Sequence, residues 1–129
     1  MPKKITDNTQ SKKGMQLTKE TINKKGKILT TEKSRPFIVC FEYILAKNYN
    51  FTTLSKSHLK ELQSFLDRVS ELKFEQVDKL YLRSPDKQDM FKGMQVKHYG
   101  FGDCFRIHGV IKEGKFFVIR LDPNHSWHG

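Results

Sequence analysis

Three short strand-like segments follow one another with almost no connecting chain near the end of this sequence, and this feature most constrains the fold. They span residues 94–101, 104–112 and 115–121. Their two connections, Gly102-Asp103 and Glu113-Gly114, are short and contain glycine. Such turns favour tight hairpins between antiparallel strands. The pattern therefore predicts a three-stranded antiparallel meander.

An amphipathic helix is expected before the meander. Its apolar residues recur with helical period at Leu59, Leu62, Phe65, Leu66, Val69 and Leu72. Ser55 or Ser57 offers an N-cap. A second short helix is predicted through Phe74, Val77 and Leu80, followed by a polar loop over residues 84–93 that opens with Pro85. The apolar stripe predicts that the helices cover a core rather than a partner.

Residues 37–45 are almost continuously apolar, which predicts a strand covered on both faces. Residues 51–54 are expected to form a short second strand after a turn. Together the elements predict an α+β fold. Its antiparallel sheet ends in the three-stranded meander and has two helices packed on one face.

The N-terminal part differs in composition from the rest. The 129-residue chain has a formal net charge of +10, and residues 1–35 contribute ten basic and three acidic side chains. No aromatic residue occurs before Phe37. We therefore expect a flexible basic arm over residues 1–35 and a single α+β domain over residues 36–129. Lys24, Lys25 and Lys27 are its candidate nucleic-acid contacts; a tail that only aids solubility is the alternative.

The remaining composition bounds the cellular setting. Cys40 and Cys104 each lie in an apolar run, and we expect two reduced, buried thiols in a cytoplasmic protein. No apolar run is long enough to span a bilayer, so no membrane partner is expected. His98, His108, His125, His128, Cys104 and Asp122 are metal-ligand types, but they lack the spacing of a known metal motif. We expect neither a metal nor another cofactor.

Strand alternation assigns side chains to the two faces of the meander. One face should meet the helices through Phe105, Ile107, Ile111, Phe117, Ile119 and Leu121. Arg106, His108 and Arg120 should then emerge together on the open face. Lys97 and Tyr99 alternate on the first strand of the meander and are expected to join them.

The segment after the last strand adds a histidine to this face. Asp122-Pro123-Asn124 is a turn signature, so the chain should fold back and bring His125 close. Arg106 and Arg120 can hold a phosphodiester, and the imidazole of His125, or of His108, can exchange protons near neutral pH. An arginine and an imidazole suffice for RNA cleavage through the 2′-hydroxyl without a metal. Trp127 is a candidate for stacking on a base.

Each of these residues also has an ordinary structural interpretation. Arg106 could pair with Asp122 or Asp103, and Arg120 could pair with Glu113 or stay solvated. His108 could be a hydrogen-bonded, half-buried histidine. His125 and His128 could belong to a frayed terminus, and Trp127 could seal the edge of the core.

The element order and the residues Phe105-Arg106-Ile107-His108-Gly109, then Phe117 to Leu121, then a nearby histidine, resemble the RelE/ParE-type toxin superfamily of small bacterial proteins. The resemblance covers about residues 37–128. It implies a metal-independent endoribonuclease in which Arg106, Lys97 and His125 have functional roles and Arg120 contacts phosphate. It also implies RNA or the ribosome as target and an acidic antitoxin as partner. The long basic arm and the Asp122-Pro123-Asn124-His125 ending depart from the family pattern.

Three functions remain open from the sequence. The first is a RelE-like toxin that cleaves or binds RNA. The second is a non-catalytic accessory protein that binds nucleic acid or the ribosome. The third is a phage or mobile-element adaptor that binds another protein.

Overall fold

The computed structural model describes residues 34–127. The folded unit begins at Arg35. The expected basic arm therefore lies almost wholly outside the described residues. Lys24, Lys25, Lys27 and His128 lie outside them as well, and their predicted roles stay predictions.

The fold is α+β, and the predicted C-terminal meander is confirmed. Its strands are β4 (Lys97–Phe101), β5 (Phe105–Lys112) and β6 (Lys115–Asp122). A short strand β1 (Val39–Cys40) completes a four-stranded sheet in the order β1-β6-β5-β4. Because β1 pairs with β6 in parallel, the sheet is mixed rather than purely antiparallel. Glu113 and Gly114 both adopt positive φ angles, as the tight β5–β6 turn requires.

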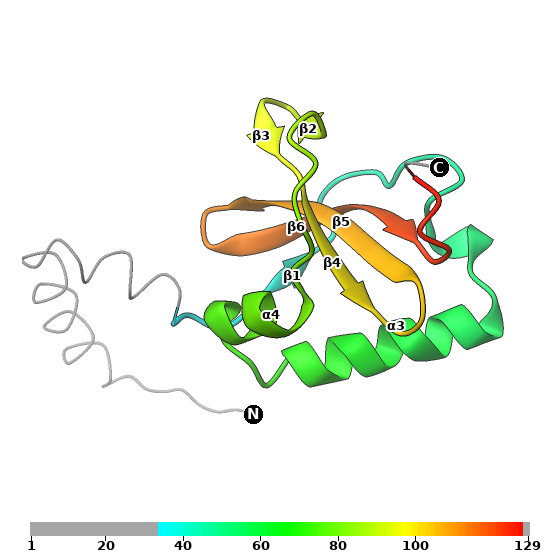
Figure 1. Cartoon of the computed structure of the whole chain (residues 1–129), viewed down its shortest axis with the longest axis horizontal. Coiled ribbons are helices and arrows are strands. Elements are labelled where there is room, and N and C mark those ends of the chain that lie inside the picture. Colours follow the sequence, from blue (N-terminus) through cyan, green and yellow to red (C-terminus); the bar gives the residue numbers. More distant parts are fainter. Residues whose placement is uncertain (1–33, 128–129) are drawn as a thin grey trace, which may run out of the picture. The chain divides into compact units, whose positions relative to one another are not determined.

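Both predicted helices are present and lie on the same face of the sheet (Figure 1). Helix α3 (Lys56–Val69) begins after Ser55, whose side chain accepts a hydrogen bond from the His58 main chain. Helix α4 (Phe74–Tyr81) follows after a short break. In α4 the apolar position Leu80 is exposed, and Tyr81 packs against the core instead.

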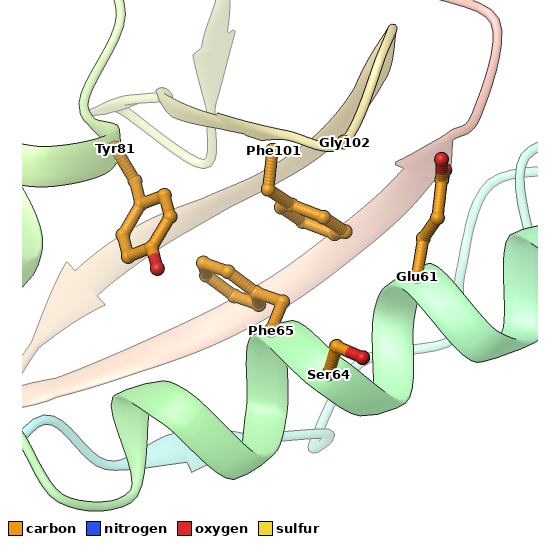
Figure 2. A pocket seen from close by; sticks show the side chains of 6 residues that line it. All are labelled: Glu61, Ser64, Phe65, Tyr81, Phe101 and Gly102. Atoms are coloured by element: carbon orange, nitrogen blue, oxygen red, sulfur yellow. The ribbon is translucent and has the colours of Figure 1, made fainter.

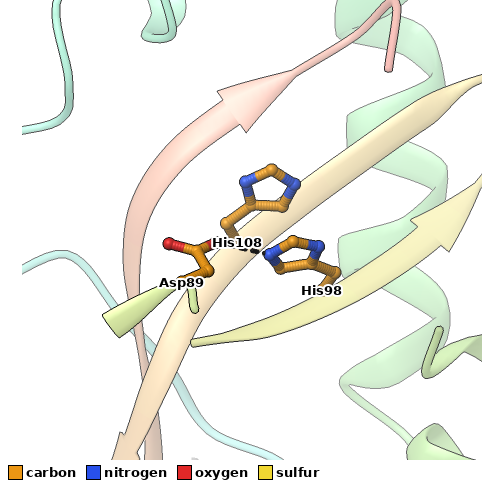
Figure 3. Close-up of side chains that lie close together, drawn as sticks. All are labelled: Asp89, His98 and His108. Atoms are coloured by element: carbon orange, nitrogen blue, oxygen red, sulfur yellow. Dashed lines mark hydrogen bonds and ion pairs between the residues drawn. The ribbon is translucent and has the colours of Figure 1, made fainter. Parts of the chain in front are cut away.

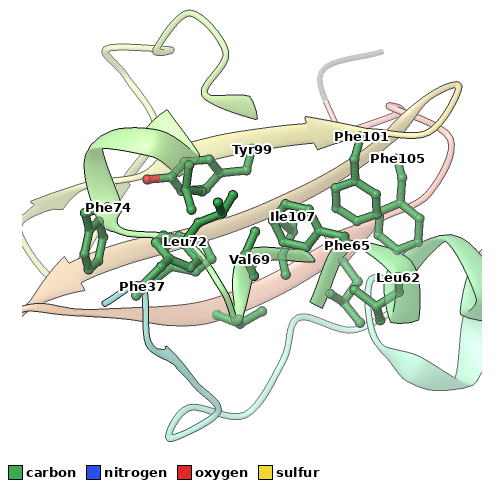
Figure 4. Close-up of a cluster of buried hydrophobic side chains, with 14 residues drawn as sticks. Phe37, Leu62, Phe65, Val69, Leu72, Phe74, Tyr99, Phe101, Phe105 and Ile107 are labelled. Atoms are coloured by element: carbon green, nitrogen blue, oxygen red, sulfur yellow. The ribbon is translucent and has the colours of Figure 1, made fainter. Parts of the chain in front are cut away.

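The main core lies between the helices and the sheet (Figure 4). Its aromatic residues are close together: the Phe65 and Phe101 rings stack at 4.2 Å, and Phe37 contacts Phe74 at 4.7 Å between ring centroids. Burial of these large aromatic rings, together with the aliphatic residues of the core, holds the helices on the sheet. Phe37 therefore anchors the first described residues in the core.

The opposite face of the sheet is partly covered by a small hairpin. Its strands are β2 (Met90–Phe91) and β3 (Met94–Gln95), and it projects away from the helices (Figure 1). Phe91 and Met94 pack against a second apolar cluster formed by Val96, Val110, Phe117 and Ile119. Residues 84–93, predicted as a plain polar loop, thus contain a strand. The first meander strand is also interrupted at Val96.

A β-bulge corrects the predicted faces of β6. His108 pairs with Arg120, but the next residue, Gly109, pairs with Val118, so Ile119 is an extra residue on β6. Alternation predicted Phe117 and Ile119 on the helix side, and this was wrong: Phe116 and Val118 lie there instead. An extra residue reverses the alternation on one side of the bulge. The assignments of Arg120 and Leu121, beyond the bulge, hold.

The segment before the helices also differs from the prediction. Only Val39 and Cys40 form a strand within residues 37–45, and Ile44 is 96% exposed. Residues 51–54 do not form a second strand, because Phe51–Thr53 is a 3-10 helix (η1). The Asn50 side chain accepts a hydrogen bond from the Thr52 main chain at 2.9 Å, which caps this turn. Local capping therefore overrides the strand propensity of Phe and Thr.

The cysteines differ in burial from the expectation. Both cysteines are free thiols, but Cys104 is exposed in the β4–β5 turn rather than buried, and Cys40 is half-buried. The apolar run misled at Cys104 because this residue lies in the turn before β5 begins. None of the helices within residues 34–127 is long and apolar enough to cross a membrane.

Replacement of Gly109 should strongly destabilise the fold. A Cβ atom there would overlap the main-chain oxygen of Phe117 and lie 2.7 Å from the Phe116 ring. We expect Gly109→Ala to lower the free energy of unfolding by about 3 kcal/mol, since a backbone atom cannot easily move aside. Urea denaturation would measure the loss.

Gly93→Ala is the matched control. Gly93 has a φ of +81° but no atom within 4 Å of an added Cβ. Only the cost of a left-handed backbone, about 1 kcal/mol, is expected there. Equal losses in the two variants would contradict the tight packing at Gly109.

Candidate functional site

Two rows of side chains cross the face of the sheet that points away from the helices. The strand register places His98, His108 and Arg120 side by side in the first row. It places Gly100, Arg106 and Asp122 in the second row. Neighbours across strands are about 5 Å apart, so the side chains within each row can contact one another.

The first row is a buried polar network completed by Asp89. Asp89 lies just before β2, and its Oδ2 atom is 2.7 Å from Nε2 of His98 (Figure 3). The same oxygen accepts a hydrogen bond from Nη2 of Arg120, and Nε of Arg120 donates to Nδ1 of His108 at 2.7 Å. Nδ1 of His108 therefore acts as an acceptor. The two imidazole rings stack at 3.8 Å between centroids.

Asp89 supplies the carboxylate of this network. Burial tends to raise the pKa of Asp89, but its hydrogen bonds and attraction to Arg120 and His98 outweigh burial and lower that pKa. Arg120 is only 6% exposed, and the ring of Trp127 covers its guanidinium at 3.8 Å. The Asp89 carboxylate thus compensates the buried Arg120 charge.

The second row differs from the first in its arginine: within residues 34–127, no carboxylate forms a salt bridge with Arg106. Arg106 lies opposite Gly100, and a Cβ at Gly100 would overlap the Arg83 side chain and lie 2.8 Å from Nη1 of Arg106. The missing side chain of Gly100 therefore leaves space for two guanidinium groups. Arg83 donates to the Gly100 carbonyl oxygen at 3.3 Å, and Arg106 donates to that of Phe105 at 3.1 Å. Within residues 34–127, neither arginine forms a salt bridge.

Asp122 explains why Arg106 has no acidic partner in its own row. Its carboxylate is buried and accepts hydrogen bonds from the main-chain nitrogens of Ser126 at 2.8 Å and Trp127 at 2.9 Å. These bonds fold the chain back after β6, as the turn signature predicts. His125 is exposed in this turn, with a φ of +54°.

The two arginines and His125 meet at one concave site. A pocket of about 360 Å³ is lined by Arg83, Ser84, Pro85, Asp86, His98, Arg106 and His125. Asp86 is its one acidic lining residue, and its Oδ1 atom accepts a hydrogen bond from the Gln88 main chain. Two guanidinium groups held by carbonyl oxygens keep their full charge, so the pocket suits an anion with several acceptor oxygens, such as a phosphate. We call it the arginine pocket.

The predicted site residues within residues 34–127 separate into three groups: those in the arginine pocket, those in the buried network beside it, and those on the helix side of the sheet. Arg106 and His125 meet in the arginine pocket. His108 and Arg120 are brought together in the buried network beside it, and the Trp127 ring, itself 37% exposed, covers the Arg120 guanidinium. His108 is hydrogen-bonded, as one alternative expected, but it is fully buried rather than half-buried.

Lys97 and Tyr99 do not join these residues. Both point to the helix side of the sheet: Lys97 lies 3.9 Å from Asp78, and the Tyr99 hydroxyl donates to Asp78 at 2.6 Å. Burial and this carboxylate raise the pKa of Tyr99, so the phenol stays protonated. The expectation that both residues share a face with Arg106 is corrected, because the pairing of Tyr99 with Ile107 puts them on the core side.

Sequence reasoning missed Arg83 and Asp89. Both lie in the segment predicted as a helix end and a polar loop. Arg83 is fixed by a hydrogen bond from its main-chain nitrogen to the His98 carbonyl at 2.9 Å. That contact depends on tertiary pairing, so no local pattern reveals where Arg83 lies. The charged residues around Pro85 only mark this segment as a possible site.

Asp89, His98 and His108 are the one set among the described residues whose possible metal-ligand atoms converge, within 4.8 Å of one another. Imidazole and carboxylate are ligands of zinc and iron. However, Arg120 already donates to both Asp89 and His108, and the imidazole planes are 19° from parallel. Their lone pairs therefore do not readily meet at one ion. The geometry fits a hydrogen-bond network better than a metal centre.

Another pocket lies on the helix side (Figure 2). It has a volume of about 280 Å³ and is lined by Glu61, Ser64, Phe65, Tyr81, Phe101 and Gly102. The stacked rings of Phe65 and Phe101 form its apolar part, and the Glu61 carboxylate lies against Gly102. This pocket contains no cation and none of the predicted site residues.

Comparisons with known proteins give no relative for this chain. No family model, no curated protein and no solved structure matches it.

Loss of the Asp89 charge should destabilise the protein in a pH-dependent way. We expect Asp89→Asn to lower the free energy of unfolding by about 3 kcal/mol at pH 7, because it leaves Arg120 buried without its counter-charge. Since the folded-state pKa of Asp89 is lowered, its contribution is complete above the unfolded-state value of about 3.9 and is lost as the pH falls further. Urea unfolding between pH 7 and pH 3 measures both effects.

Asp103→Asn provides the control, because Asp103 is exposed in the β4–β5 turn. This variant should keep the wild-type pH dependence. If Asp89→Asn retained the same loss of stability below pH 4 as the wild type, Asp89 would not be its source.

Proposed function

We propose that this protein binds RNA and cleaves it without a metal ion, as a toxin-type endoribonuclease of the RelE-like kind. One observation carries the proposal: Arg83 and Arg106, held by carbonyl oxygens rather than carboxylates, share a pocket with His125. Two adjacent cations repel each other, and a bound phosphodiester would relieve that repulsion.

The roles of the residues follow from their chemistry. Arg83 and Arg106 would hold the phosphodiester and stabilise the charge that develops on its oxygens. His125 would exchange protons: the 2′-hydroxyl loses its proton and attacks phosphorus, the bond to the 5′ oxygen breaks, and that oxygen gains a proton. His125 is the better candidate than His108, because His108 is buried and already bonded to Arg120.

A non-catalytic role in binding nucleic acid or the ribosome is the second candidate. The observation in its favour is the charge of residues 1–35, which gives affinity for any polyanion. Lys24, Lys25 and Lys27 would act in the same way under both functions. A cytoplasmic site of action and an acidic antitoxin-like partner belong to the toxin proposal.

Two substitutions distinguish cleavage from binding. His125→Ala should reduce the cleavage rate of single-stranded RNA at least about 100-fold with little change in affinity, because it removes proton transfer. Arg106→Ala should weaken RNA binding and lower the slope of log affinity against log salt by about 1, because one phosphate contact is lost. RNA cleavage and fluorescence anisotropy at several salt concentrations measure these effects.

Arg68→Ala is the matched control for Arg106→Ala, since Arg68 is exposed on α3, outside the arginine pocket.

Controlled expression provides a second test. The wild type should arrest growth and degrade cellular RNA, whereas the Arg106→Ala/His125→Ala double variant should do neither. Healthy growth and intact RNA in both strains would contradict an autonomous nuclease, and RNA binding without cleavage would favour the second candidate.

A further inference from the structure

We propose that a second pocket, next to the arginine pocket, binds an unpaired nucleobase of the RNA. It is lined by Leu82, Arg83, Pro85, Lys87, Gln95, Val96 and Lys97. We call it the base pocket. This inference rests on the proposed RNA-binding function and specifies its substrate as single-stranded RNA.

The size and lining of the base pocket suit a flat apolar group. Its volume is about 460 Å³, within the range of about 300–1,000 Å³ usual for small-molecule sites. Leu82 and Pro85 supply aliphatic surface, against which a base can pack, while Val96 at the floor is itself buried. A guanidinium such as that of Arg83 can also stack on a base.

The charges around the base pocket favour a nucleotide over a neutral apolar ligand. Arg83, Lys87 and Lys97 are cationic, and none of the seven lining residues is acidic. Lys97 lies 3.9 Å from the carboxylate of Asp78. Both side chains are partly exposed to solvent, which screens this ion pair and weakens it. An apolar surface with a cationic rim matches a base attached to a sugar-phosphate chain.

The two pockets are neighbours, because Arg83 and Pro85 line both. A phosphate bound by Arg83 and Arg106 would therefore place a neighbouring nucleotide beside the base pocket. A paired base is stacked within a duplex and cannot enter a pocket of this kind. The geometry thus selects unpaired RNA.

The walls of the base pocket are held by main-chain contacts. Leu82 forms a bridge with Tyr99, and Arg83 donates to the His98 carbonyl. The side-chain Nε2 of Gln95 also donates to the main-chain carbonyl oxygens of Asp86 at 2.8 Å and Asp89 at 3.2 Å. A pocket fixed in this way can bind a base without the cost of ordering its own walls.

The test compares two RNA ligands of equal charge bound by the full chain. One is fluorescein-labelled hexa-adenylate, and the other is an abasic ribose-phosphate oligomer of the same length. Any charge attraction, including that of residues 1–35, is the same for both. The wild type should bind hexa-adenylate about five- to hundredfold more tightly, the range expected for one stacked base.

Leu82→Glu and Leu80→Glu form a matched pair of variants. Both leucines are exposed, but Leu82 lines the base pocket and Leu80 does not. Leu82→Glu should lose the preference for hexa-adenylate, and Leu80→Glu should keep it. Equal preference in the two variants would overturn the assignment to this pocket.

A measurement on the wild type covers the case in which Leu82→Glu fails to fold. Adenosine 5′-monophosphate should shift the methyl NMR signals of Leu82, which lines the pocket and is exposed, and leave those of Leu80 unchanged. Unchanged signals at Leu82 would overturn the base pocket.

The outcomes separate the two proposals. Equal affinity for both oligomers, with binding still dependent on Arg106, would overturn the base pocket and leave the phosphate site standing. Binding of neither oligomer would overturn both.

Discussion

The polar network on the outer face of the sheet is organised around one buried carboxylate. Asp89 belongs to a segment outside the main sheet, yet it bonds to His98 on β4 and Arg120 on β6. Its carbonyl oxygen also accepts a hydrogen bond from Val96 at 2.9 Å. These contacts fix the segment that carries Arg83 and Pro85, so the walls of both pockets depend on Asp89.

Arginines on this face are held in two different ways, and the difference separates structure from proposed function. Arg120 bonds to a carboxylate and is covered by Trp127, so its charge is compensated inside the protein. Arg83 and Arg106 bond to carbonyl oxygens, which orient a guanidinium without cancelling its charge. Only the second arrangement leaves a positive potential for a ligand to neutralise.

The features that the sequence predicted correctly depend on neighbours along the chain. The β5–β6 turn follows from Glu113-Gly114, α3 follows from its Ser55 cap and apolar stripe, and the fold-back of His125 follows from the turn residues after β6. Two features that it missed depend on distant contacts: the parallel pairing of β1 and the position of Arg83. The β2–β3 hairpin was missed although it is local, with a turn at Lys92-Gly93. The bulge at Ile119 was missed for another reason: β6 is apolar on both sides of it, so the extra residue reverses the faces without changing the apolar pattern.

The parallel pairing of β1 with β6 has a consequence for synthesis on the ribosome. Chains emerge with the N-terminal end first, so Val39 and Cys40 wait for a partner strand that is made more than 70 residues later. Phe37 likewise has no complete core until Phe116 follows. His125 is added later still. A nascent or prematurely terminated chain therefore has neither a finished sheet nor a complete arginine pocket, and any activity would begin only after β6 and the turn beyond it have left the ribosome.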